Sequence, residues 1–188
     1  MGASTGDDAD EFRIALSSLR QVRYRHEIHV EEAPAPQRLA PYAVALSADV
    51  MDADEDLANG RLVVLHDPVG QDAWAGTFRV VAFVRATLEP EMAADPVLAE
   101  VGWSWLIEAL ETHGAAYSMI SGTVTRVTSE SFGGLSDRPL EGQLELRASW
   151  TPQSPDLAGH AQAWAEVLGQ AAGLVPLPPG VAQLPHPR

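Results

Sequence analysis

The chain contains no cysteine and no lysine among its 188 residues. The absence of cysteine excludes disulfides, thiolate catalysis and cysteine-ligated zinc or iron–sulfur sites. The absence of lysine excludes a lysine Schiff base and the lysine of a phosphate-binding loop. No apolar run approaches the roughly 20 residues of a membrane-spanning helix. The N-terminal segment MGASTGDDADEF has neither a cationic start nor an apolar stretch, so we expect no secretory signal and a cytoplasmic location.

Negative charge dominates the composition, with a formal net charge of −14. A field of this sign repels nucleic acid and anionic membranes, so neither is predicted as a partner. A local basic patch stays possible in the first helix, which holds Arg13, Arg20, Arg23 and Arg25 close together. No cofactor-binding motif is present, and no cofactor is predicted.

Hydrophobic spacing predicts three helices and six strands. We expect helices to begin at Asp10, Asp95 and Ser154–Pro155, with Gly114 and Gly173 ending the second and third. We expect strands over Glu27–Glu31, Tyr42–Val50, Arg61–His66, Thr77–Leu88, Thr123–Thr128 and Gln143–Trp150. The segments DADEDLANG and HDPVGQ are predicted to be turns.

The element order α-β-β-β-β-α-β-β-α has connections too short for helical crossovers. It predicts a single α+β domain over residues 10–174, with a mainly antiparallel sheet of about six strands and helices on one face. Residues 1–9 lack periodicity and are expected to be disordered. Residues 175–188 form a proline-rich tail.

The stretch VTRVTSESFGG (124–134) runs from a strand pattern into hydroxyls, a carboxylate, an aromatic ring and two glycines. It lacks the lysine of a phosphate loop and the Gly-x-Ser-x-Gly of a nucleophile elbow. One interpretation is a hairpin loop in which Gly133 and Gly134 supply positive φ. The alternative is a contact surface formed by Ser129, Glu130, Ser131 and Phe132.

Three acidic or histidine-rich motifs have simpler explanations than metal binding or catalysis. DADED has Leu57 where a calcium loop needs glycine and Val63 where it needs glutamate. His26 and His29 point to opposite faces of a strand, so they do not chelate together. His66 and Asp67 stand where acid–base residues can lie, although Asp-Pro is also ordinary turn chemistry.

Several other side chains are candidates for binding another protein. Trp103 lies about 200° from the apolar face of its helix, so it either packs on another element or is exposed. Phe83 lies between Arg79 and Arg85 on the less apolar face of its strand. Arg126 lies in the strand part of the stretch 124–134 and belongs to the same candidate set.

Four long phrases resemble an actinobacterial family of uncharacterised proteins of about this length, over residues 10–152. They are RLAPYAVALSADV, GRLVVLHDPVGQDAWAGTFRVVAFVRATLEPEMAADP, EVGWSWLIEALETHGA and SGTVTRVTSESFGG. This resemblance implies an actinobacterial cytosolic protein and brings no activity, catalytic residue or cofactor. The element order is also similar to the secretion-chaperone and YbjN-like architecture, with one extra strand, which implies protein binding, often as a dimer.

Three functional hypotheses follow. The first is a non-enzymatic protein-binding or adaptor module that acts through a sheet face or helix surface, with a homodimer as one form of this association. The second is a small enzyme in which His66, Asp67, Ser129, Glu130 or Arg126 meet in a cleft. The third is a small-molecule carrier with a pocket between sheet and helices.

Overall fold

The structure of the protein is a computed structural model that describes residues 5–53 and 55–176. Its helices are α1 (Thr5–Gln21), α2 (Pro90–Ala93), α3 (Leu98–Thr112) and α4 (Ala158–Ala171), with a 3₁₀ turn at Gly133–Leu135. Its strands are β1 (Ile28–Ala33), β2 (Tyr42–Asp52), β3 (Glu55–Gln71), β4 (Gly76–Leu88), β5 (Tyr117–Ser129) and β6 (Glu141–Pro152).

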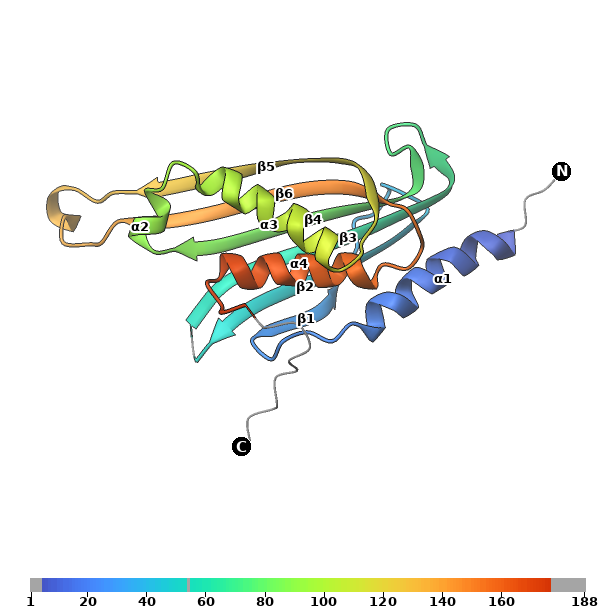
Figure 1. Cartoon of the computed structure of the whole chain (residues 1–188), viewed down its shortest axis with the longest axis horizontal. Helices are drawn as coiled ribbons and strands as arrows, with labels where there is room; N and C mark the ends of the chain where they lie inside the picture. The colour runs from blue at the N-terminus through green and yellow to red at the C-terminus, as the bar shows by residue number, and fades with distance from the viewer. Residues whose placement is uncertain (1–4, 54, 177–188) are drawn as a thin grey trace.

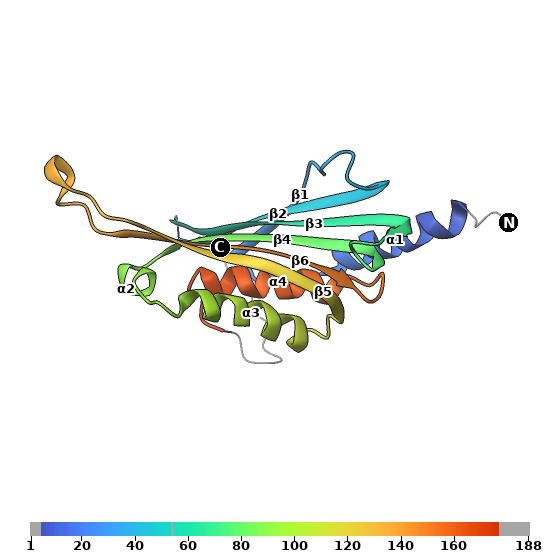
Figure 2. The ribbon, with the colours of Figure 1, turned by 90° about the horizontal axis from the view of Figure 1, so that it is seen from above.

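The six strands form one antiparallel sheet in the order β1-β2-β3-β4-β6-β5. Helices α3 and α4 lie on the same face of this sheet, and α1 lies at one end of that side (Figures 1 and 2). The predicted α+β class with an antiparallel sheet is confirmed. The strand order follows from hairpins, except that β6 inserts between β4 and β5. β4 and β5 therefore run parallel and are joined by a helical crossover through α3, so the prediction that no connection is a helical crossover is wrong.

Two expected turns are mostly strand. β3 begins at Glu55 and continues to Gln71, because the β2–β3 ladder extends to the pair Asp52 and Glu55 after a bulge at Val50/Met51. The chain reverses with Ala53 at a φ of 56°. At the other end, the β3–β4 ladder is interrupted between His66 and Gln71 before a short turn at residues 72–75.

The helix starts also differ from the prediction. α1 begins at Thr5, so Asp10 lies inside the helix rather than at its N-cap. Asp95 does not cap α3, because Val97 occupies the N-cap position and the Asp95 carboxylate accepts the N–H of Val97 at 3.0 Å. The helix ends are confirmed, because Gly114 and Gly173 take φ values of 62° and 75° just after α3 and α4.

Strand alternation places the main core between the sheet and α3 and α4. The largest fully buried side chains there include Trp150 and Trp164. His160 of α4 is buried beside them, and its Nδ1 accepts the Trp150 Nε1–H at 2.9 Å. Burial lowers the pKa of His160 to about 4, against the opposing charge of Asp156, so the imidazole is a neutral part of the core.

On the opposite face, the sheet is covered over only one corner. The segment between β1 and β2 folds over one corner, where Ala45, Val63 and Leu65 are buried beside Trp74. The Arg61 guanidinium donates to the Pro34 carbonyl and ties that segment to β3. Over β4, β6 and β5 the described chain leaves this face open (Figure 2).

Candidate functional site

Three of the predicted binding residues share the open face of the sheet. Arg79, Phe83 and Arg85 alternate along β4 with the buried residues of its other side. We call Arg79, Phe83, Arg85, Glu145 and Arg147 the open-face cluster. Arg147 pairs with Phe83 across the β4–β6 ladder, and its guanidinium lies 5.2 Å from the ring centroid. Glu145 lies 2.7 Å from Arg147 and 3.9 Å from Arg85.

Arg79 is held by hydrogen bonds rather than offered to solvent. It donates to Ser149 Oγ at 2.7 Å, to Thr151 Oγ1 at 3.1 Å and to the Met119 carbonyl at 2.9 Å. Partial burial lowers the pKa of its guanidinium from the ordinary value. The open-face cluster is thus an internally paired network, as expected for the solvated face of an antiparallel sheet.

Ser129, Glu130, Ser131 and Phe132 lie where β5 passes into the loop of the β5–β6 hairpin. The antiparallel β5–β6 ladder agrees with the hairpin interpretation, and Gly133 has the expected positive φ of 63°. Gly134 is not in the positive-φ region, so that part of the prediction is wrong. The loop projects beyond the other strands (Figure 1), and Phe132 is 74% exposed.

Arg126 and Trp103 belong to the other face. Arg126 donates to the carbonyls of Ala93 and Asp95, which ties the end of β5 to the segment before α3. Trp103 is half-buried against the core, and its ring fits over Gly122, where a Cβ would meet it at 2.7 Å. Of the two interpretations left open for Trp103, packing is therefore the one that the structure supports.

The residues proposed from the sequence as a catalytic cleft do not lie close together in the structure. His66 pairs with Phe78 at one end of β4, whereas Ser129 pairs with Glu141 beyond Leu88 at the other end. Ten residues of strand separate these ends, which is about 33 Å. His66 is instead buried, stacked on the Phe78 ring at 4.1 Å between centroids. The proposed cleft of His66, Asp67, Ser129, Glu130 and Arg126 is therefore wrong.

The two edges of the sheet differ in length and charge. β1 has six residues with Glu31 and Glu32, and prolines follow it. β5 has thirteen residues, of which only Arg126 is charged, and is rich in threonine and valine. Met119 and Val127 on it are 54% and 47% exposed. Short length and charge protect natural edges from further pairing, and β1 has both. β5 has neither, and its register irregularity between Ser118 and Ser121 leaves the rest of the strand regular.

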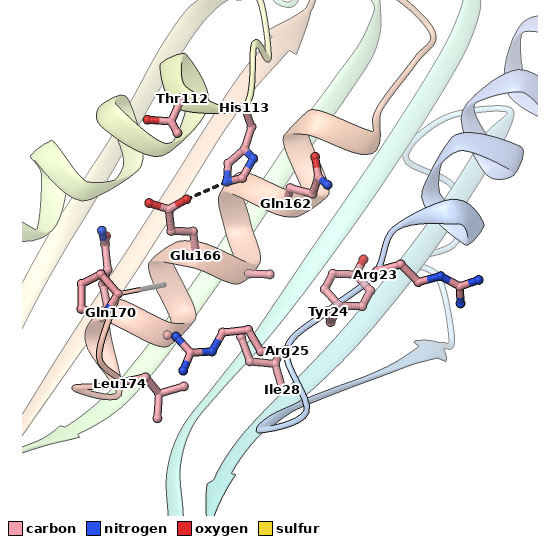
Figure 3. Close-up of a pocket in the computed structure, with 13 residues that line it drawn as sticks. Arg23, Tyr24, Arg25, Ile28, Thr112, His113, Gln162, Glu166, Gln170 and Leu174 are labelled. Carbon is pink, nitrogen blue, oxygen red and sulfur yellow. Dashed lines mark hydrogen bonds and ion pairs between the residues drawn. The ribbon is translucent and has the colours of Figure 1, made fainter. Parts of the chain in front are cut away.

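A cavity of about 330 Å³ lies on the helix side near β1, and sequence reasoning missed it. Its wall is formed by the α1–β1 segment, the end of α3, one side of α4 and the residues after α4 (Figure 3). The lining residues are Arg23, Tyr24, Arg25, Ile28, Thr112, His113, Gln162, Ala165, Glu166, Gly169, Gln170, Leu174 and Pro176. No sequence pattern joins these segments, because they meet only through the fold.

The charged groups of the cavity are partly paired. His113 Nε2 lies 2.6 Å from a Glu166 carboxylate oxygen, linking α3 to α4. Arg25 donates to Glu27 at 3.0 and 3.3 Å and to the Val175 carbonyl at 2.8 Å. Figure 3 shows the Arg23 guanidinium pointing away from the other lining side chains. Glu166 and Arg25 therefore both have partners within the described chain.

Two buried polar atoms without a hydrogen-bond partner in the described chain belong to this wall. They are Tyr24 Oη and Gln170 Oε1. A buried polar group without a partner costs about 1–3 kcal/mol. Burial also raises the pKa of Tyr24 to about 12. Both residues line the cavity, but the two atoms themselves have almost no accessible surface, so they lie behind the open space rather than in it.

Gly169 of α4 faces the same cavity. Glycine inside a helix costs about 1 kcal/mol relative to alanine. At Gly60, by contrast, a Cβ would lie 2.7 Å from the Phe83 carbonyl, so packing demands a glycine there. A Cβ at Gly169 would lie 3.8 Å from Leu174 Cδ1 and 3.9 Å from Ile28 Cδ1, which is ordinary contact. Packing therefore does not require a glycine at this position. The absence of a side chain at Gly169 leaves the cavity larger than an alanine would.

Within the described part of the chain, no three His, Asp or Glu side chains come together as metal ligands. Helices there are also too short or too polar to span a bilayer. The fold and its surfaces thus define an α+β domain with a helix-covered sheet face, an open sheet face, a long exposed edge at β5 and the cavity beside α4.

The chain belongs to the family described as protein of unknown function (DUF3000), which matches residues 8–182. This result confirms a family of uncharacterised proteins, and the actinobacterial origin stays a prediction. Neither the comparison with curated proteins nor the comparison with solved structures finds a match.

Proposed function

We propose that this protein is a non-enzymatic, cytoplasmic protein-binding module that associates by strand pairing at β5. The observation that carries the proposal is the contrast between the protected β1 edge and the long, almost uncharged β5 edge. An edge strand presents unpaired N–H and C=O groups that form main-chain hydrogen bonds with an added strand. The net charge of −14 repels nucleic acid and anionic membranes, so a protein is favoured as the partner.

The strand added at β5 is the β5 of a second copy. Two identical antiparallel strands pair about a twofold axis, which gives a closed dimer. β5 contains no acidic residue in a chain that has 26, so repulsion is weakest along this strand. Its single cation, Arg126, is held against backbone carbonyls on the helix side. Exposed Val97 and Val101 near the N-terminal end of α3 add apolar surface on that side.

Sedimentation velocity over a range of concentrations tests the dimer. The wild type should be dimeric, and the double variant Thr125→Lys/Val127→Lys should be monomeric, because lysines on an edge oppose pairing. His29→Lys is the matched control, since His29 is exposed on the same face at the β1 edge, and it should stay dimeric. A wild type that remains monomeric at its solubility limit contradicts self-pairing.

The cysteine-free chain allows the register to be mapped. Single substitutions Thr123→Cys, Thr125→Cys and Val127→Cys place one thiol at successive positions on the open face of β5. A disulfide requires Cα atoms about 4.4–6.8 Å apart, so only positions near the twofold axis cross-link on mild oxidation. His29→Cys should not cross-link. Equal cross-linking at His29 and throughout β5 indicates random collision and contradicts the proposal.

A further inference from the structure

The cavity beside α4 offers apolar surface rather than free charge. Its volume is about 330 Å³, and apolar side chains such as Ile28 and Leu174 line it. The charged and titratable groups His113, Glu166 and Arg25 on its wall have partners, and the two unpartnered polar atoms lie behind the open space. An apolar occupant therefore matches this wall better than a charged one.

The chain is redirected over this cavity as it leaves α4. Gly173 has a φ of 75°, and its N–H donates to the Gln170 carbonyl at 3.0 Å. The Leu174 N–H donates to the Gly169 carbonyl at 2.9 Å. These two bonds form the Schellman motif, which ends a helix at a left-handed residue and brings an apolar contact with it. Leu174 consequently lies close to Gly169, since its Cδ1 would be 3.8 Å from a Cβ there.

The next two residues keep the chain at the rim of the cavity. The Arg25 guanidinium donates to the Val175 carbonyl at 2.8 Å, and Pro176 belongs to the lining. Pro176 is also the last described residue, so residues 177–188 continue from the cavity itself. A segment tethered at this point is present at a high effective concentration, which favours its binding over that of a free molecule.

The sequence of residues 177–188, LPPGVAQLPHPR, suits an apolar cavity. Leu177, Val181 and Leu184 are apolar, and the segment contains no acidic residue in a chain that has 26. Its prolines restrict the backbone before binding, which lowers the entropy that docking costs. The family match extends to residue 182, so the first half of this segment belongs to the domain that the family shares.

We infer that the cavity beside α4 is the intramolecular docking site of the C-terminal segment 177–188. The apolar side chains of the segment lie against Ile28, Ala165 and Gly169. The absence of a side chain at Gly169, which packing does not require, leaves room for them. The cavity is lined by Ile28 of β1, at the opposite edge of the sheet from β5, so this docking does not depend on dimerisation.

The cysteine-free chain allows a single nitroxide label to be placed on the segment. Gln183→Cys carries the label in the full-length, nitrogen-labelled protein and leaves the apolar residues of the segment unchanged. In two-dimensional NMR spectra the label should broaden the backbone signals of Tyr24, Gly169 and Gln170, so that they lose most of their intensity. The matched control is Ser136→Cys on the exposed loop of the β5–β6 hairpin, where the same label should leave these signals unchanged.

Two variants of the labelled protein locate the site from its two sides. Gly169→Leu fills the cavity, and its folded form should lose the broadening. Leu177→Ser/Val181→Ser/Leu184→Ser removes the apolar side chains of the segment without touching the described domain, and it should also lose the broadening. Gly102→Ala should keep it, because Gly102 is a buried glycine of α3 with room for a Cβ, away from the cavity. The NMR spectrum of each variant reports whether it is folded.

Three results would overturn the inference. The first is that the label at position 183 leaves the cavity signals as intense as the label at position 136 does. The second is equal broadening when spin-labelled protein without nitrogen label is mixed with nitrogen-labelled protein without spin label, because the segment would then come from a second copy. The third is unchanged broadening in the triple serine variant, which would show that apolar docking does not hold the segment there.

Discussion

The two faces of the sheet are made from the same strands but hold different kinds of side chain. On the covered face, Trp150, Trp164 and His160 are buried, and both indole N–H groups donate hydrogen bonds. On the open face, Phe83 and Arg147 form a partly exposed, internally paired surface. The difference indicates that stability is concentrated on one face, while the open face and its β5 edge remain available for association.

The two faces meet at Phe83. Its ring lies on the open face, whereas its carbonyl accepts the Trp164 Nε1–H at 3.2 Å from the covered side. Gly60 makes this approach possible, because a Cβ there would lie 2.9 Å from Leu168 and 3.1 Å from Trp164 Nε1. Replacing Phe83 by alanine removes the ring from the open face and keeps the carbonyl that accepts the Trp164 N–H. This substitution therefore tests the contrast between the two faces directly.

The largest expected effect is on the covered face. Trp164→Ala should lower the free energy of unfolding by about 3–5 kcal/mol, because it removes a fully buried aromatic side chain. Phe83→Ala should cost less than about 1.5 kcal/mol, since its ring is partly exposed and the backbone carbonyl stays in place. Urea unfolding measures both values. Similar costs at the two positions would mean that the faces contribute equally.

The next effect is a pH dependence that arises on the covered face alone. Burial lowers the pKa of His160 from about 6.5 in the unfolded chain to about 4 in the folded protein. Because the unfolded chain takes up the proton first, stability should fall as pH decreases from about 6.5 to 4, by roughly 3 kcal/mol. Nothing is expected from this residue above pH 7.

His160→Gln isolates this contribution, because its amide oxygen can still accept the Trp150 indole N–H but does not titrate. The difference in unfolding free energy between wild type and variant should change across this pH window and stay constant above it. A constant difference throughout would show that the folded imidazole is protonated as easily as the unfolded one.

A smaller loss is expected at Trp103, which lies on the covered side but near the β5 edge. Trp103→Ala should cost about 2 kcal/mol, because the ring is half-buried over Gly122. Dimerisation measured by sedimentation should change less than in the Thr125→Lys/Val127→Lys variant. Loss of the dimer with little loss of stability would instead place Trp103 in the interface.

The class of fold and most of its elements were predictable because alternation and helical spacing are local signals. β4 is an example, since Phe78, Val80 and Ala82 recur at every second position and all face the core. Strand ends were predicted less well, because the ladder partners of Asp52 and Gln71 lie on other strands. The insertion of β6 between β4 and β5 likewise depends on contacts between distant segments.

The candidate surfaces were only partly predictable for the same reason. Phe83 and Arg79 were identified because strand alternation alone places them on one face. Trp103 had two interpretations, because its environment is set by Gly122 of another element. The threonine- and valine-rich run in β5 was visible, but its position at an edge requires the strand order. The cavity requires the whole fold, since Tyr24, His113 and Gln170 come from three segments.

The smallest expected effect is a gain in stability at the cavity, where the covered face is least complete. Tyr24→Phe removes a buried hydroxyl that has no partner and keeps the ring, so the free energy of unfolding should rise by about 1 kcal/mol. In the wild type the raised pKa of about 12 should appear as one late tyrosine in an ultraviolet titration, absent from the variant. Because the folded pKa lies above the unfolded value of 10, wild-type stability should decline between pH 10 and about 12. A variant less stable than the wild type would show that the hydroxyl already has a partner, and the contrast between a fully paired core and an unpaired cavity wall would then be lost.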